Sequence, residues 1–235
     1  MKTYTTTPLF AALILLVGLI DSAHADNDNE LRLGAYLIHY NAQAQDAVGT
    51  GAAAVPSGYH LNLSVDNVQT LYLAYVRHLS PHFDLELAAG IPPKTNTVGK
   101  GSPTFGSVPF AGQTIATTRW FSPTLLVNYK FLDPSSAFRP YMGLGVNYTH
   151  FYNNASTAAG DAVGGGPTLV NLSDSVGASG TIGISYRVKK DWTLYGSYSQ
   201  THIRSAAELI SAGASRKTTI DFQPGAVVLS AGYSF

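Results

Sequence analysis

Apolar and polar side chains alternate at every second residue in eight stretches of the chain. Alternation of this kind is typical of β-strands whose two faces meet different surroundings. In the most regular stretch, Val176, Ile182 and Tyr186 take one face, and Ser179 and Thr181 take the other. The predicted strands cover residues 31–40, 67–79, 83–91, 119–131, 139–152, 175–188, 192–203 and 218–235.

The connections between the predicted strands alternate in length. Short turns are expected at residues 78–82, 132–138 and 189–191. Long connections are expected at residues 41–66, 92–118, 153–174 and 204–217. Bacterial outer-membrane barrels have short periplasmic turns and longer external loops, and their strands of about ten residues cross the bilayer at a tilt. The pattern therefore predicts an all-β fold, an eight-stranded antiparallel transmembrane β-barrel in the outer membrane of a Gram-negative bacterium.

Aromatic residues gather near both ends of the predicted strands, as they do at the two interfaces of a membrane. Those near the short turns are Phe83, Tyr129, Phe131, Tyr186, Trp192, Tyr233 and Phe235. Those toward the long loops are Tyr40, Phe121, Tyr148, Phe151 and Tyr198. Alternation alone also fits a secreted soluble barrel, and that alternative stays open.

Residues 1–25 have the features of a cleaved signal peptide, which leaves residues 26–235 for the barrel. Lys2 precedes an apolar run over residues 9–20, and Ala23-His24-Ala25 forms a small-residue cleavage site. A helix of that length rises only about 18 Å, which is too short for a hydrocarbon core of roughly 30 Å. We therefore expect an exported chain without this segment.

Charge and residue types exclude several classes of function. The chain has 14 basic and 14 acidic residues, so it lacks the basic excess of a nucleic-acid-binding protein. It has no cysteine, and its histidines lack metal-ligand spacing, so we expect no metal site and no cofactor. His78-Leu79-Ser80 has the spacing of a catalytic pair in some outer-membrane lipid A deacylases, but it falls in a predicted periplasmic turn. We expect no catalytic residues.

Four stretches resemble the OmpW/AlkL family of eight-stranded outer-membrane proteins. They are residues 122–131 (SPTLLVNYKF), 138–148 (FRPYMGLGVNY), 172–183 (LSDSVGASGTIG) and 230–235 (SAGYSF). The resemblance implies a barrel that passes small hydrophobic molecules through the outer membrane, with an apolar entrance and a sideways exit through the wall. It also implies contact with outer-membrane lipid and lipopolysaccharide, and recognition by the barrel-assembly machinery through the strand ending at Phe235.

Pro123 lies inside the fourth predicted strand. Proline cannot donate a hydrogen bond to a strand ladder, so it is rare in central strands. One interpretation is an open wall at the outer leaflet, which would form the lateral exit. The other is a proline at a strand start or a bulge, and the sequence does not separate the two.

The predicted long loops are rich in apolar residues, which a soluble surface avoids unless they bind something. We expect a funnel for apolar solutes; the alternative is packing between loops or against lipopolysaccharide. The funnel residues are Val55, Tyr59, Phe105, Val108, Phe110 and Ile115.

Three charged residues share the polar faces of the predicted strands near the short turns. Glu86, Lys130 and Arg187 are expected to form a paired cluster that plugs the lower lumen, with an ion-selectivity ring as the alternative. Higher in the lumen, the small residues Ala88 and Ser199 predict a wide or wet interior, which Tyr36, Tyr72 and Tyr195 would narrow.

Three functions remain in competition. The first is passive uptake of small hydrophobic molecules. The second is a non-transporting envelope barrel that serves as an anchor, adhesin or phage receptor through its loops. The third, less favoured, is a lipid-modifying enzyme.

Overall fold

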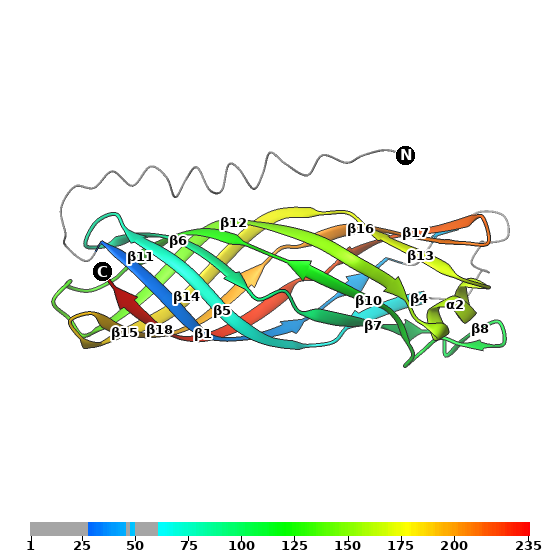
Figure 1. The fold of residues 1–235 in the computed structure, drawn as a ribbon, viewed down its shortest axis with the longest axis horizontal. Coiled ribbons are helices and arrows are strands. Elements are labelled where there is room, and N and C mark those ends of the chain that lie inside the picture. Colours follow the sequence, from blue (N-terminus) through cyan, green and yellow to red (C-terminus); the bar gives the residue numbers. More distant parts are fainter. Residues whose placement is uncertain (1–27, 46–47, 50–60) are drawn as a thin grey trace.

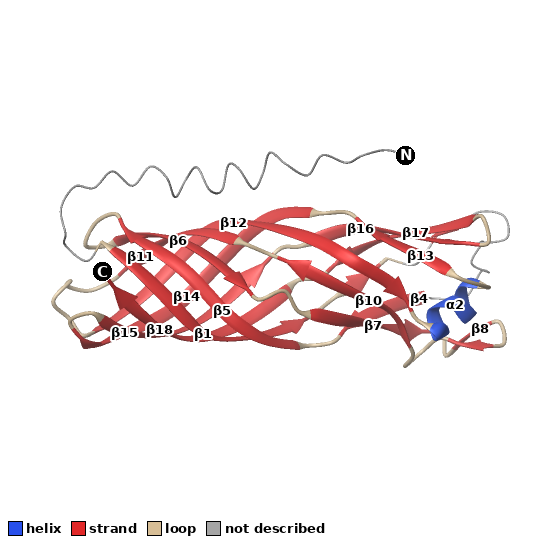
Figure 2. Cartoon of the chain, viewed as in Figure 1, coloured by secondary structure: helices blue, strands red, loops and turns tan. Residues whose placement is uncertain are grey.

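The computed structural model describes residues 28–45, 48–49 and 61–235, which form a long β-tube with tilted strands (Figures 1 and 2). The predicted signal peptide and the funnel residues Val55 and Tyr59 lie outside this range. Among the described residues, no helix is long and apolar enough to cross a membrane.

Eight antiparallel strands close into a barrel in the half of the tube that carries the C-terminus (Figure 1). Each strand pairs with the next one along the chain, and pairing of the first with the last closes the circle. The predicted fold class is thereby confirmed. The strands are β1 (Asn29–Tyr40), β5 (Val68–His78), β6 (Phe83–Gly90), β11 (Thr124–Lys130), β12 (Phe138–Ser156), β14 (Ser175–Lys189), β15 (Trp192–Thr201) and β18 (Pro224–Ser234).

Above this barrel the strands continue as an extension instead of the predicted long loops. One sheet joins the upper part of β12 to β10 (Thr114–Phe121), β7 (Lys94–Gly101) and β4 (Leu61–Val65). A second sheet joins β13 (Thr168–Leu172), β16 (Arg204–Ser211) and β17 (Ala214–Asp221), with β2 (Gln43–Ala44) and β3 (Val48–Gly49) paired to β17. The short strands β8 (Thr104–Phe105) and β9 (Val108–Pro109) and the helix α2 (Ala158–Gly164) lie at the far end (Figure 2).

The two halves of the tube have opposite polarity. In the barrel, large apolar side chains such as Leu33, Leu144 and Ile182 point outward, and Glu30 and Asn128 are buried inside. In the extension, most outward positions are polar, with exceptions such as exposed Leu169, and large apolar side chains lie inside, as in a soluble protein. Exposed Lys94, Arg119 and Arg204 lie beside buried Trp120 and Ala207. The prediction of long loops was wrong for the segments that form these strands, and the reversal explains why. Their outer positions are mostly polar and many of their inner positions are Thr or Ala, so hydrophobicity alternates only weakly along the sequence.

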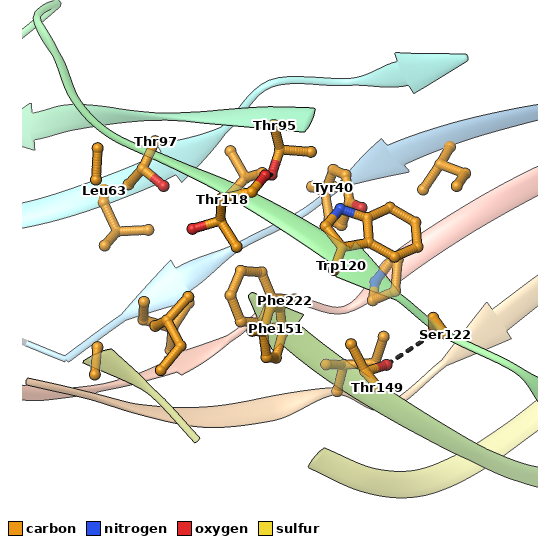
Figure 3. Close-up of a pocket in the computed structure, with 18 of the residues that line it drawn as sticks. Tyr40, Leu63, Thr95, Thr97, Thr118, Trp120, Ser122, Thr149, Phe151 and Phe222 are labelled. Atoms are coloured by element: carbon orange, nitrogen blue, oxygen red, sulfur yellow. Dashed lines mark hydrogen bonds between the residues drawn. The ribbon is translucent and has the colours of Figure 1, made fainter. Parts of the chain in front are cut away.

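The aromatic girdle is confirmed at the short-turn end and only in part at the other end, where Phe121, Tyr148 and Tyr198 have the outward parity. There Phe83, Tyr186, Trp192, Tyr233 and Phe235 are all exposed on the outer face. At the other end Tyr198 points outward, but Phe151 is buried inside, and Tyr40 faces the same cavity (Figure 3). The reason is strand parity: Tyr40 shares the inner face of β1 with Arg32, and Phe151 shares that of β12 with Thr149.

Candidate functional site

An apolar cavity occupies the interior where the extension meets the barrel. The atom-free space there is about 980 Å³ when the adjoining open solvent is counted with it, so the closed part of the cavity is smaller. Figure 3 shows aromatic side chains from different strands pointing into it. Phe151 stacks on Phe222 with ring centroids 5.3 Å apart, and Tyr40 meets Trp120 edge to face at 6.4 Å. Aliphatic side chains complete the lining: Ile38, Leu63, Val65, Ile115, Val170, Leu172, Ile203, Leu209 and Ile220.

Several polar groups in the cavity wall are hydrogen-bonded to the wall itself. Ser122 Oγ and Thr149 Oγ1 lie 2.7 Å apart, and the Asn147 amide donates to Ser122 Oγ at 2.8 Å. Thr95 Oγ1 donates to the Thr118 carbonyl oxygen at 3.3 Å. Because these groups are already paired, the surface offered to a solute is mostly hydrocarbon, the surroundings that an apolar ligand requires.

The upper approach to this cavity brings together part of the proposed funnel. Phe105, Phe110 and Ile115 line one recess between α2 and the strands of the extension. Val108 lies in β9, opposite Phe105 in the β8–β9 hairpin. Arg216 lies over the Phe105 ring, with its guanidinium carbon 5.5 Å from the ring centroid. Ile115 lines both this recess and the cavity, so the two lie next to each other at this residue.

Below the cavity, the barrel lumen is closed by a network of buried charges. Arg32 donates from Nε to Glu30 at 2.6 Å and from Nη1 to Glu86 at 2.8 Å. Lys130 Nζ lies 2.6 Å from Asp84 Oδ2, and Asp84 also contacts His78 Nδ1 at 2.7 Å. Three carboxylates therefore face two basic side chains, with His78 at the edge.

Tyrosine and asparagine side chains complete this network. Asn128 donates to Glu86 at 2.7 Å, and the Tyr72 hydroxyl donates to the same carboxylate. Tyr195 donates to Glu30 at 2.8 Å, and its ring lies 3.6 Å from the Arg32 guanidinium carbon. We call the group Glu30, Arg32, Asp84, Glu86 and Lys130, with these partners, the charged floor.

The predicted charge cluster is therefore corrected in two respects. Arg187 lies outside the floor, on the exposed surface, where it donates to the carbonyl oxygens of Pro134 and Ser135 in the β11–β12 turn. Glu86 pairs with Arg32 and not with Lys130. The register explains the second difference: Asp84 stands opposite Asn128 on β11, so Lys130 is its diagonal neighbour on the same face.

The sequence prediction missed Arg32, Glu30 and Asp84. Arg32 and Glu30 both occupy inner-face positions of β1. The alternation along residues 31–40 was the signal from which Arg32 could have been assigned to the lumen. The contact between Arg32 and Glu86 crosses β5 and depends on the register of three strands. Alternation assigns a side chain to a face but does not give that register.

Between the floor and the cavity the lumen is narrow. Ala88 and Ser199 both line this stretch, together with Thr181, and Ser199 donates to Thr181 Oγ1 at 3.0 Å. Tyr36 and Tyr72 meet edge to face there, with ring centroids 5.7 Å apart. Tyrosine rings thus occupy part of the space that the small residues leave.

The wall beside the cavity has an unpaired stretch at Pro123. Strand β6 pairs with β11 up to Ala88 and Thr124, and pairing resumes between β7 and β10 at Lys94 and Arg119. No hydrogen bond between residues 89–93 and residues 120–123 occurs in the described part of the chain. We call this stretch the wall break. Trp120 and Ser122 face the cavity on its inner side, while Ile91 is exposed outside.

The backbone hydrogen bond that Pro123 cannot donate is missing on the side of β12, and not on the side of the wall break. Its carbonyl oxygen accepts from the Tyr148 backbone N–H at 3.0 Å, so the nitrogen of the same residue also faces β12. Pro123 immediately precedes β11, as the strand-start interpretation expects. On the facing strand, the Ile91 N–H donates to the Leu71 carbonyl oxygen on β5. Successive backbone nitrogens of a strand point to opposite sides, so the nitrogen of Pro92 faces the wall break, and it has no hydrogen to donate.

A second unpaired stretch of wall, between β12 and β13, is bridged by Asp174. This carboxylate accepts from the Tyr148 hydroxyl at 2.6 Å and from the Phe151 backbone N–H at 3.3 Å, and it lies 2.9 Å from His150 Nδ1. Partial burial alone would raise the pKa of Asp174, but the hydrogen bonds from Tyr148 and His150 lower it. The carboxylate therefore stays ionised and holds the two strand ends together.

His78 and Ser80, which have the spacing of a catalytic pair, both make hydrogen bonds to neighbouring residues of the barrel. His78 contacts Asp84, and Ser80 Oγ accepts from the backbone N–H groups of His82 and Phe83 in the turn. In the described part of the chain, no group of three or more His, Asp or Glu side chains is placed to hold a metal ion.

Comparison with known proteins gives consistent matches. The sequence pattern of the OmpW family matches residues 30–235. Outer membrane protein W of Salmonella typhi is 32% identical over 240 residues, which covers 100% of both chains. The crystal structure of OprG from Pseudomonas aeruginosa superposes with a TM-score of 0.77 at 25% identity, covering 90% of this chain and 97% of that one. The solid-state NMR structure of AlkL in DMPC bilayers shares the fold, with a TM-score of 0.63, 16% identity, and 92% and 94% coverage.

Proposed function

The chain belongs to the OmpW family of outer-membrane β-barrels, and we propose that it is a passive channel for small hydrophobic molecules, which leave sideways into the bilayer near Pro123. It lies in the outer membrane of a Gram-negative bacterium. The observation that carries the proposal is the position of an apolar cavity above a charged floor and beside an unpaired stretch of wall.

The charged floor supports a sideways route. An apolar solute in the cavity would have to pass buried ion pairs to reach the periplasm, and separating such pairs costs several kcal/mol. The wall break offers a path from hydrocarbon side chains to lipid with no charged group on the way. The β12–β13 stretch is less suitable, because Asp174 bridges it with hydrogen bonds.

The proposed entrance is the recess lined by Phe105, Phe110 and Ile115. It adjoins the cavity at Ile115, and in this proposal a solute passes from one to the other and remains in contact with apolar surface from the outside to the wall break. Neither step includes a chemical reaction, and the proposed channel is not an enzyme.

Uptake of radiolabelled octane tests this proposal in cells that lack or express the protein. Thr118→Arg places a charge in the cavity and should lower protein-dependent uptake at least about tenfold, since burying an unpaired charge in an apolar site costs several kcal/mol. Thr118→Trp fills the same space without a charge and should also block uptake.

The matched control is Ala206→Arg, which adds the same charge on the exposed outer face of β16. This variant should take up octane like the unmodified protein. Heat-modifiable gel mobility verifies that each barrel is folded. Normal octane uptake in a folded Thr118→Trp protein would favour the anchor, adhesin or receptor function over transport.

A further inference from the structure

Two cations face each other on the outer surface of the extension with no carboxylate between them. Lys94 on β7 and Arg119 on β10 are register partners, and both side chains are exposed. Their neighbours Thr95 and Thr118 are buried and face the cavity, so Lys94 and Arg119 point away from it. Like charges directly opposite each other in an antiparallel pair destabilise a sheet.

The surroundings do not neutralise this pair. Within the described part of the chain, neither side chain has an ion-pair partner within 4.0 Å. Asp66, which follows the neighbouring strand β4, accepts from the Asn96 side-chain amide at 3.1 Å. On the other side, Tyr152 is the register partner of Arg119 and stacks with His150, at 5.8 Å between ring centroids. The patch is thus cationic with polar aromatic neighbours.

The height of the pair on the tube suggests what neutralises it. Ile91 is exposed on the apolar belt of the barrel, and Lys94 follows it after only Pro92 and Pro93. The pair therefore lies directly above the lipid hydrocarbon, at the level of the lipid headgroups. In the outer leaflet these headgroups carry phosphate, which Arg and Lys bind with charge-assisted hydrogen bonds.

We propose that Lys94 and Arg119 form a binding site for a phosphate group of lipid A, the membrane anchor of lipopolysaccharide. The phosphate offsets the repulsion between the two cations, and the acyl chains lie against the apolar belt below. The site is independent of the transport proposal, because both side chains are on the outside of the wall.

Native mass spectrometry of the whole refolded protein in detergent tests the site, with diphosphoryl hexa-acyl lipid A as the probe. In Lys94→Gln/Arg119→Gln, the dissociation constant for this lipid should rise at least about tenfold, as expected for two lost charge-assisted bonds. Without lipid, the variant should be at least as stable as the parent protein, because the repulsion is removed. Loss of stability would instead indicate a structural role and overturn the proposal.

The matched control is Lys100→Gln, which removes an exposed charge from the same strand, farther from the apolar belt. Its affinity for lipid A should change less than about twofold, as for other isolated surface charges. Lipid A without its phosphates should bind the parent protein and the double variant equally. Equal binding of diphosphoryl lipid A to both proteins, or its displacement by equimolar inorganic phosphate, would overturn the assignment.

Discussion

At the scale of single residues, Arg32 is the centre of the charged floor. Its guanidinium pairs with two carboxylates and lies on the Tyr195 ring, and Arg32 is 3% exposed. A buried charge without its partner is costly, since removal of one member of such a pair destabilises a protein by about 3–5 kcal/mol.

We therefore expect Arg32→Met to be strongly destabilising, because it leaves Glu30 and Glu86 unpaired. Arg32→Met/Glu86→Gln should recover part of the loss. Urea unfolding in lipid vesicles, followed by tryptophan fluorescence, measures the coupling between the two positions. Arg187→Gln with Glu86→Gln is the control pair and should be additive, because Arg187 contacts only backbone oxygens of a turn. Additivity of Arg32 and Glu86 would contradict the floor.

Residue parity was predictable from the sequence, whereas pairing was not. Alternation correctly assigned Glu86 and Lys130 to the lumen and Leu144 and Ile182 to lipid. It gave no register, so it matched Glu86 with the wrong base and included Arg187, which shares the lumen parity but lies beyond the end of the lumen. The sequence analysis also placed Tyr40 and Phe151 at the membrane interface, whereas both face the cavity. An aromatic ring at a strand end suits a membrane interface and a cavity equally.

At the scale of strands, the reversal of polarity between barrel and extension is the main departure from the sequence prediction. In residues 204–217, the inner positions Ser205 and Ala207 are small, and the outer positions include both charged Arg204 and apolar Ala206, so hydrophobicity does not alternate regularly. Among the described apolar residues of the predicted loops, Ile115 and Ala116 line the cavity, and Phe105 and Phe110 line the recess above it. The turn residues and the alternation in the barrel strands were sufficient to predict the fold class. They do not show at which residue the apolar face of a strand changes from the outside to the inside of the tube.

The reversal gives outward-facing arginines opposite consequences in the two halves. Ile182→Arg, on the lipid face of β14, should cost about 2–4 kcal/mol near the bilayer midplane. Ala206→Arg, on the outer face of β16, should be close to neutral. Thr181→Arg, in the lumen, should be milder than Ile182→Arg, because partners in the lumen can solvate the charge. Heat-modifiable gel mobility and urea unfolding report all three, and equal effects of Ile182→Arg and Ala206→Arg would contradict the assigned polarity.

At the scale of the whole molecule, the tube combines three parts in series: the recess lined by Phe105, Phe110 and Ile115, which we propose as the entrance, the apolar cavity, and the charged floor, with the wall break at the level of the cavity. A solute that prefers hydrocarbon has a continuous apolar path only if it leaves through the wall. The central claim is therefore that the wall break opens for transport, and a reversible lock across it is the most direct test.

The natural chain has no cysteine, so one engineered pair can be oxidised selectively. Extension of the Lys94–Arg119 register places Phe121 opposite Pro92, and Pro92→Cys/Phe121→Cys would tie the two edges of the wall break. The control is Asn96→Cys/Thr117→Cys, whose positions are already paired in the continuous sheet. The measurement is the initial rate of octane uptake into cells before and after reduction. With the disulfide across the break verified, we expect at least about fivefold slower uptake when oxidised, full recovery on reduction, and no change in the control. Equal uptake in the oxidised and reduced states of the locked protein would contradict the lateral exit.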